Sequence, residues 1–159
     1  MNQINVGIGE FAVSNNSSDV IKTFALGSCV AVIAYDKICK VAGLLHVALP
    51  ESKINLNKSK QLPGYFADTG LPILMTEMKK KGANLRKIWI KLIGGANVIK
   101  GNFSFDIGKR NSLAIKKILW RYSLGIIKEE IGGKISRTVD IDVKTGRVSI
   151  YSRQVKKIL

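Results

Sequence analysis

The chain has 159 residues, of which 46% are hydrophobic and 23% charged, which is typical of a globular fold and too apolar for intrinsic disorder. No apolar run approaches the roughly 20 residues of a membrane-spanning helix, and residues 1–5 lack the basic and apolar parts of a secretory signal. We therefore expect one cytoplasmic domain, residues 1–159.

The charge is strongly basic, with 26 Lys and Arg against 11 Asp and Glu and a formal net charge of +15. Such a balance is found in proteins that bind nucleic acid, anionic membranes or acidic proteins. The basic residues are scattered in short clusters, without an aromatic-rich RNA-binding motif. This favours a solvated basic surface, with an acidic protein partner as the main alternative. No nucleic-acid partner is predicted. A nucleic-acid-binding protein would be recognised by strongly salt-dependent binding to a duplex.

The first half of the chain has the pattern of strands joined by polar turns. The β-branched, apolar run that follows Cys29 is typical of a buried strand. A helix that begins near Cys29 is the alternative. Ile4 to Ile8 and Phe11 to Val13 together are expected to form a first extended segment. Further strands are expected at Val20 to Leu26, Val30 to Tyr35 and Val41 to Val47, followed by a polar, mobile loop from Glu51 to Gln61.

The second half contains two predicted helices. The first spans about Thr69 to Lys81, with Pro72 in its first turn and Gly82 at its end. The second spans about Asn111 to Ser123, with Gly125 as its C-cap. Four further strands are expected, at Lys87 to Ile93, Ile126 to Ile131, Thr138 to Val143 and Arg147 to Tyr151.

Hairpins outnumber crossover units in this order of elements, which indicates an α+β fold. We expect mixed β-sheets to form the core, with the two main helices packed outside. The glycine pairs Gly94-Gly95 and Gly132-Gly133 lie outside any G-x-G-x-x-G or P-loop context. They are better explained as tight turns at strand ends than as phosphate sites.

The residues available for catalysis by a thiol are few, because the chain has two cysteines, Cys29 and Cys39, and one histidine, His46. Three such residues cannot supply the four ligands of a structural zinc site. Two cysteines in a cytosolic chain are also poor evidence for a disulfide. No metal and no other cofactor is predicted.

Cys29 is the candidate nucleophile, with His46 as its base. Cys29 follows Gly27 and Ser28, whose small size allows a sharp turn, close approach of a substrate and N–H groups directed at an oxyanion. His46 lies near the end of the returning strand, and an imidazole there would shift the thiol toward the thiolate. The alternative is that both are ordinary core residues. Cys39 lacks a glycine turn and is interpreted as structural or incidental.

Seven short motifs along the chain occur in a particular order and at particular spacings. They are TFALGSCV (23–30), GLLHVALP (43–50), YFAD (65–68), GGA (94–96), IGKRN (107–111), IGG (131–133) and TGRV (145–148). Each is weak alone, but together they resemble the pattern of one known family, the CheD chemoreceptor glutamine deamidases. The resemblance extends from about Val6 to Val155.

The resemblance implies a protein-glutamine glutaminase that converts receptor glutamines to glutamate and releases ammonia. The family's nucleophile and base fall on Cys29 and His46, and its third catalytic position falls on Thr23. The resemblance also implies the fold of the cytotoxic necrotizing factor deamidase. The implied partners are chemoreceptor cytoplasmic domains as substrates and a CheC-type phosphatase as regulator, with recruitment to receptor clusters.

Four further residues are expected to form the oxyanion and substrate-binding part of the site: Gly27, Ser28, Tyr65 and Asn111. Asn111 and Asp68 are equally well explained as residues at helix starts. The loop Lys134 to Ser136 departs from the family pattern. This departure leaves open a non-catalytic chemotaxis adaptor that binds the CheC phosphatase.

Overall fold

The computed structural model describes residues 1–98 and 106–159, and within these ranges the chain forms ten strands and three α-helices. The strands make two five-stranded sheets. Sheet A has the order β1 (Asn2–Val6), β3 (Asp19–Leu26), β8 (Arg137–Asp142), β9 (Val148–Ser152) and β10 (Val155–Ile158). Sheet B has the order β2 (Phe11–Ser14), β5 (Val41–Val47), β4 (Val30–Asp36), β6 (Ile88–Gly94) and β7 (Ile126–Ile131).

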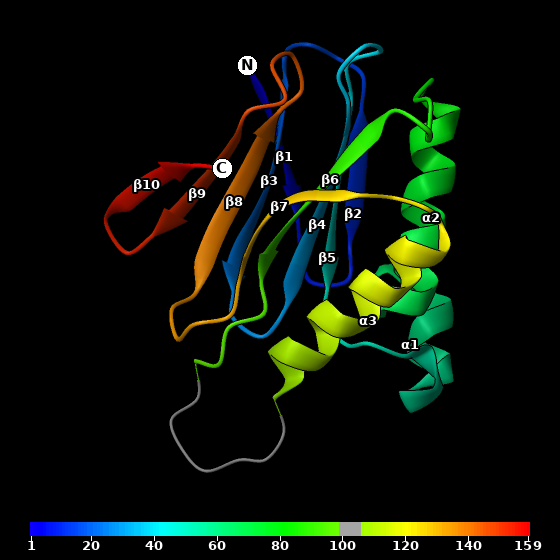
Figure 1. Ribbon diagram of the computed structural model, residues 1–159, viewed down its shortest axis with the longest axis vertical. Helices are drawn as coiled ribbons and strands as arrows, with labels where there is room; N and C mark the ends of the chain where they lie inside the picture. The colour runs from blue at the N-terminus through cyan, green and yellow to red at the C-terminus, as the bar shows by residue number, and fades with distance from the viewer. Residues whose placement is uncertain (99–105) are drawn as a thin grey trace.

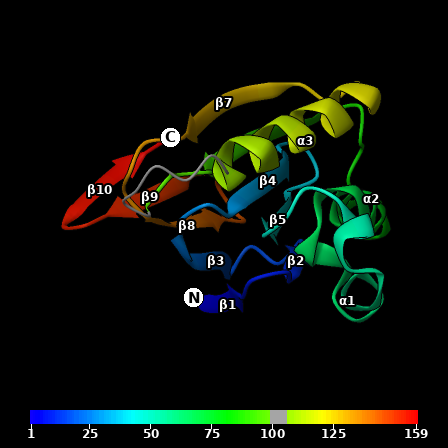
Figure 2. The ribbon, with the colours of Figure 1, turned by 90° about the horizontal axis from the view of Figure 1, so that it is seen from below.

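The molecule has three layers, with sheet B between sheet A and the helices (Figures 1 and 2). The pairs β1–β3 and β6–β7 are parallel and the other pairs are antiparallel, so both sheets are mixed. The predicted α+β class with helices outside is confirmed. The helices are α1 (Leu56–Gln61), α2 (Ala67–Lys80) and α3 (Ile107–Arg121), with 3-10 turns at Ser52–Ile54 and Pro63–Tyr65.

Sheet B is buried on both faces, which explains why β4 and β5 are buried along their whole length. Because side chains alternate along a strand, the two faces feed two separate clusters. One cluster packs β4 and β5 against α2 and includes Val32, Ala34, Leu45, Leu71, Leu74 and Met78. The other fills the space between the sheets and includes Ile21, Ala31, Ile33, Leu44, Val139 and Ile141.

The two long helices end in the same way, although only one has the glycine that the sequence suggests. After α2, Gly82 has a φ of +97° and the next N–H bonds back to Met78 O at 3.0 Å. After α3, Ser123 takes this left-handed position with a φ of +55°, and Leu124 N donates to Leu119 O at 3.0 Å. The prediction that Gly125 caps this helix is therefore wrong.

Other boundaries also differ from the predictions. Residues 51–61 were expected to form a mobile loop, but they hold the 3-10 turn and α1, which begins with the Asn55 side chain accepting from Lys58 N. Helix α2 starts at Ala67, so Pro72 lies inside the helix and not in its first turn. The first extended segment divides between the sheets as β1 and β2, and β10 was not predicted. Short polar elements such as these carry little periodicity to detect.

The described helices are too short or too polar to span a bilayer.

Candidate active site

The centre of the candidate site is a hydrogen bond between the two sheets. Thr23 on β3 and His46 on β5 are both buried, and Thr23 Oγ1 lies 2.7 Å from His46 Nδ1. The same hydroxyl donates to Val6 O on β1 at 2.7 Å. Directly after Thr23 the pairing of β3 with β8 shifts register, and Ala25 takes a φ of +53°. Such bulges redirect a strand and are common beside functional sites.

These two bonds determine where the neutral imidazole carries its proton. A carbonyl oxygen can only accept, so the single hydroxyl proton of Thr23 is directed at Val6 O. Thr23 Oγ1 must then accept from His46, which places the imidazole proton on Nδ1. His46 Nε2 is left with its lone pair, and this buried atom has no hydrogen-bond partner among the described residues. It is therefore available to take a proton.

Cys29 lies on the same side of sheet B as His46. Ala31 of β4 is paired with His46, and Cys29 precedes Ala31 by two residues, so the pleat directs their side chains to one face. Consistent with this, Cys29 packs against the cluster between the sheets. In antiparallel sheets, such diagonal neighbours are about 7–8 Å apart between Cα atoms. The predicted buried strand after Cys29 is confirmed as β4, which begins at Val30, and the alternative of a helix that begins near Cys29 is excluded.

Burial determines the charge state of both groups. Desolvation lowers the pKa of His46 to about 4, so the imidazole is neutral at pH 7. Desolvation also raises the pKa of the Cys29 thiol, and a hydrogen bond from its own backbone only partly offsets this. The direction is opposite to the thiolate shift expected from the sequence. The protein without substrate thus holds a neutral thiol and a neutral imidazole.

Glycines allow the end of β6 and the start of α3 to lie close to the backbone of Cys29. Gly94 has a φ of +118°, and a Cβ there would collide with Cys29 O, so only glycine fits. Gly95, the next residue, donates its backbone N–H to Cys29 O at 2.8 Å. Gly108 in the first turn of α3 packs on the Gly95 carbonyl just as closely. The predicted position of Gly94-Gly95 at a strand end is confirmed, since β6 ends at Gly94, and these glycines hold the Cys29 backbone against β6 and α3.

Asn111 connects the segment before Cys29 to the end of β5. Its side chain is fully buried, and Nδ2 donates to Ser28 O at 3.0 Å and to Ala48 O at 2.9 Å. Asn111 Oδ1 is buried without a partner in the described part of the chain. The alternative interpretation of Asn111 as a helix-start residue is excluded, because Asp106 caps α3 by accepting from Lys109 N. Only the packed structure reveals its two carbonyl partners.

Arg137 connects the two glycine turns beside the site. Its guanidinium donates to Gly94 O at 3.3 Å and to Gly132 O at 2.9 Å, and it lies 3.3 Å from the Glu130 carboxylate. Gly132 and Gly133 both have a positive φ, as expected of a tight turn. The arginine next to the divergent loop Lys134 to Ser136 thus anchors the backbone on which Gly94 lies.

The other predicted residues have different surroundings. Gly27 O accepts from Ala96 N at 2.8 Å, and Gly27 packs against the Val98 side chain. Tyr65 is half-buried next to Phe66 and has Lys58 Nζ 4.4 Å from its ring centre, while its carbonyl accepts from Ala48 N. Asp68 is not an N-cap, because it lies inside the first turn of α2 and accepts from Ser52 N at 2.9 Å.

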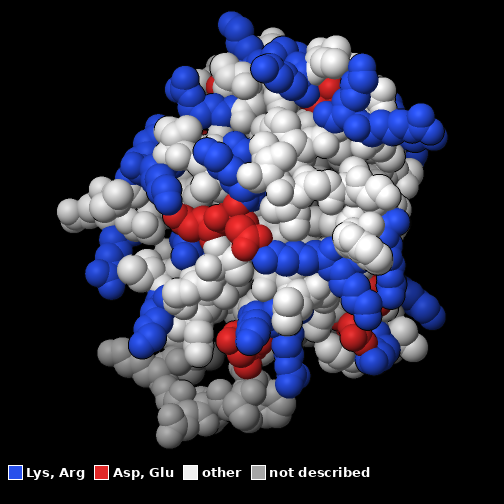
Figure 3. All heavy atoms as spheres, viewed as in Figure 1, with Lys and Arg blue, Asp and Glu red and all other residues white. Residues whose placement is uncertain are grey.

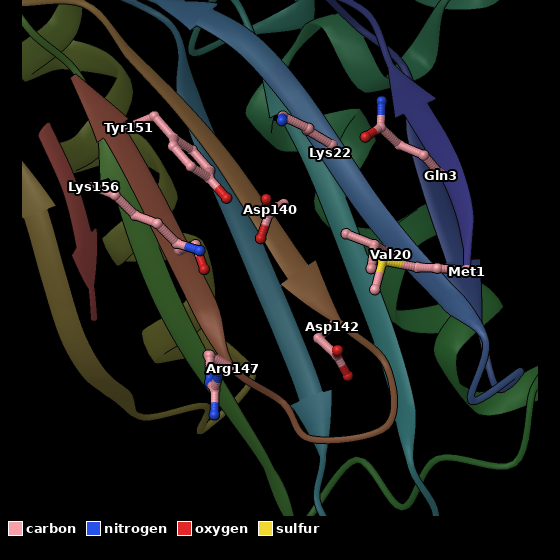
Figure 4. Close-up of a pocket in the computed structure, with 10 residues that line it drawn as sticks. Met1, Gln3, Val20, Lys22, Asp140, Asp142, Arg147, Tyr151 and Lys156 are labelled. Carbon is pink, nitrogen blue, oxygen red and sulfur yellow. The ribbon is translucent and has the colours of Figure 1, made fainter. Parts of the chain in front are cut away.

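A hollow of about 430 Å³ lies on the outer face of sheet A, away from Thr23 (Figure 4). Lys22 lines it from the residue before Thr23, so alternation directs these two neighbours to opposite faces of the sheet. Tyr151 lies beside Lys22, with the ammonium 4.8 Å from the ring centre. The described residues contain no group of three His, Cys, Asp or Glu side chains able to hold a metal ion.

Comparison with known proteins identifies the family. The family model described as CheD chemotactic sensory transduction matches residues 48–152. The chain belongs to the CheD family. A relative from Syntrophotalea carbinolica, named probable chemoreceptor glutamine deamidase CheD, is 50% identical over 152 residues, 94% of each chain. A protein of the same name from Thermococcus kodakarensis is 38% identical over 159 residues, covering 99% of this chain and 97% of its own. The family predicted from the seven motifs is thus confirmed.

Proposed function

We propose that this CheD-family chain is a protein-glutamine glutaminase that deamidates glutamine side chains of chemoreceptors, acting as one domain, residues 1–159. The observation that carries the proposal is the Thr23–His46 hydrogen bond, because it leaves Nε2 unprotonated on the face that Cys29 shares. The names of the CheD relatives support the substrate. The proposed catalytic residues are Cys29 as nucleophile, His46 as base and Thr23 as the group that orients His46.

The first half of the reaction forms a thioester. Cys29 Sγ attacks the glutamine Cδ while its proton passes to His46 Nε2, so a neutral pair needs no preformed thiolate. The negative charge that develops on the amide oxygen would be held by backbone N–H groups around Gly27 and Ser28. The imidazolium then gives its proton to the leaving nitrogen, and ammonia departs as the C–N bond breaks.

The second half releases glutamate. His46, neutral again, takes a proton from a water molecule that attacks the thioester carbonyl. As the C–S bond breaks, the imidazolium returns the proton to Sγ and the resting thiol is restored. The sum is one water consumed, one ammonia released and one glutamate formed. A pKa of about 4 keeps His46 ready as a base at neutral pH, while Thr23 Oγ1 stabilises its cation only weakly, so the cation passes its proton on readily.

Two further residues have supporting roles in this proposal. Asn111 positions Cys29 relative to the end of β5 through its bonds to Ser28 O and Ala48 O. Tyr65 supports the same end of β5, since its carbonyl accepts from Ala48 N and Leu49 N at 3.0 Å. The proposal also includes recruitment of the protein to receptor clusters in the cytoplasm by its chemoreceptor substrates, with a CheC-type phosphatase as its regulatory partner.

The test is mass spectrometry of a chemoreceptor cytoplasmic domain incubated with the protein. Conversion of amide to acid adds about 1 Da at each modified glutamine. We expect this gain with the wild type and with Cys39→Ala, the matched control, and no gain with Cys29→Ala. An unchanged receptor mass with folded wild-type protein would exclude the enzyme and favour a non-catalytic adaptor.

A further inference from the structure

A groove of about 490 Å³ lies between the segment that follows β5 and the outer side of α3. Its apolar lining comes from both sides: Pro50 and Ile54 from the segment, Leu113 and Ala114 from the helix. Ile54 is 58% exposed and Leu113 is 55% exposed. Large apolar side chains gathered at one exposed hollow commonly mark an interaction site.

The apolar surface continues along α3 beyond the groove. Leu113, Lys117 and Trp120 follow one another at spacings of four and three residues, so they form one stripe on the helix. Trp120 is 80% exposed, which is unusual for a tryptophan. The stripe therefore extends about one helical turn beyond Lys117 and ends in an aromatic side chain of the kind that dominates binding at interfaces.

The groove has a cationic rim. Lys53, Arg110 and Lys117 line it, whereas Glu51 is the one acidic residue among its lining residues and pairs with Lys53 at 2.6 Å. Lys and Arg side chains are spread over the face of the molecule on which α3 lies (Figure 3). An apolar floor with a cationic rim is complementary to a segment that carries both apolar and acidic side chains.

The groove adjoins the candidate active site. Arg110 precedes Asn111, whose side chain points inward to Ser28 O and Ala48 O, and Ala114 follows Asn111 by one turn. Pro50 comes two residues after Ala48. The same short stretches of α3 and of the segment after β5 thus anchor the Cys29 backbone on their inner side and form the groove on their outer side.

We propose that this groove is a docking site for an acidic, amphipathic segment of the protein substrate, next to the segment that presents the target glutamine. The inference rests on the proposed function, since it takes the deamidated protein as the occupant. Docking here would raise the local concentration of glutamine at Cys29 without contacting the reacting atoms. Part of the strongly basic charge would then serve to recruit the substrate.

The test separates docking from chemistry by measuring binding in the Cys29→Ala background. The affinity of this variant for a chemoreceptor cytoplasmic domain is measured by calorimetry, with and without Lys117→Glu or Leu113→Ser. Each added change is expected to raise the dissociation constant roughly 10-fold, because a rim charge is reversed or an apolar anchor is lost. Lys79→Glu, on the exposed end of α2, is the matched control and is expected to bind normally.

Every outcome decides the proposal. Equal affinity of the Lys117→Glu, Leu113→Ser and Lys79→Glu proteins, or no receptor binding at all, would overturn the docking site even if the wild type deamidates the receptor. Groove-dependent binding by a wild type that leaves the receptor mass unchanged would support docking and refute the proposed function. Duplex DNA that binds through Lys117 in place of the receptor domain would assign the groove to nucleic acid and overturn the inference. Thermal unfolding of each variant verifies that it is folded.

Discussion

The β4–β5 hairpin carries a cysteine at each end, and the two ends differ in almost every respect that matters for chemistry. Cys29 is half-buried at the open end, on the side of sheet B that faces Thr23 and His46. Cys39 is exposed in the turn, where its N–H donates to the Asp36 carboxylate at 3.0 Å. The same residue type is thus a candidate nucleophile at one end and part of a turn at the other. Neighbouring segments from sheet A, β6 and α3 make the difference.

The two ends also differ in whether they favour the charged or the neutral form of a buried side chain. At the open end, the buried His46 meets only a hydroxyl at Nδ1, so burial disfavours its cation. At the turn end, burial alone would raise the pKa of Asp36, but N–H groups of Asn84, Cys39 and Ile38 outweigh it and lower the pKa. The open end is built to hold a neutral base, and the turn end is built to hold a charged acid.

Among changes that leave Cys29 in place, the largest effect is expected at the open end, for Thr23→Val. This change keeps the volume but removes the acceptor that holds the proton on Nδ1, so Nε2 is no longer reliably the unprotonated nitrogen. We expect deamidation to fall by about 10²-fold, a typical contribution of oriented acid–base catalysis. Thr23→Ser should restore most of the rate. The measurement is kcat/KM on a receptor domain by mass spectrometry.

The control for Thr23→Val is Thr76→Val, which removes an exposed hydroxyl on α2 that donates to Pro72 O. Thermal unfolding separates loss of rate from loss of structure. Full activity in a folded Thr23→Val protein would mean that the inter-sheet hydrogen bond does not serve catalysis.

The next largest effect is on stability, where the two ends should respond in different pH windows. His46 has a pKa of about 4 when folded, against an ordinary value of 6.5. The unfolded chain therefore binds the proton more readily, and stability should decrease by about 3 kcal/mol as the pH falls from 6.5 to 4. Asp36 has a lowered pKa, so its contribution should persist above about pH 4 and be lost below it.

Urea unfolding at a series of pH values measures both windows. His46→Gln should flatten the change between pH 6.5 and 4, whereas Asp36→Asn should lower stability throughout the range above about pH 4 and change the pH dependence only in the more acidic region. A wild type whose stability is constant from pH 6.5 to 4 would contradict the depressed pKa of His46.

The smallest effect concerns the two thiols themselves. Burial raises the pKa of Cys29, and partial desolvation together with the nearby Asp36 carboxylate raises that of Cys39. Because Cys29 is also less accessible, we expect it to react with iodoacetamide several-fold more slowly than Cys39 near pH 8. Labelling rates across pH in the Cys29→Ser and Cys39→Ser proteins measure this. A Cys29 that titrates below an ordinary thiol would instead indicate a resting thiolate–imidazolium pair.

Local pattern was sufficient to predict much of the fold. The apolar run of β4 and the return strand β5 stand out by composition and were predicted within a residue at each end. Helices α2 and α3 were visible from their periodicity, and Gly82 correctly marked the end of α2, but the starts of both helices and the cap of α3 were not predicted. A proline was accommodated inside α2, and a serine took the left-handed position after α3. Tertiary packing overrides local preference at such positions.

The sequence by itself determined the chemistry that is available: one histidine, a cysteine behind two small residues, and an ordered set of motifs that identifies the CheD family. Tertiary structure alone decided how these groups can act. Thr23 meets His46 only because sheet A packs on sheet B, and Asn111 reaches the Cys29 segment only because α3 crosses sheet B. Burial between the layers, which no local pattern encodes, keeps the imidazole neutral and raises the pKa of the thiol.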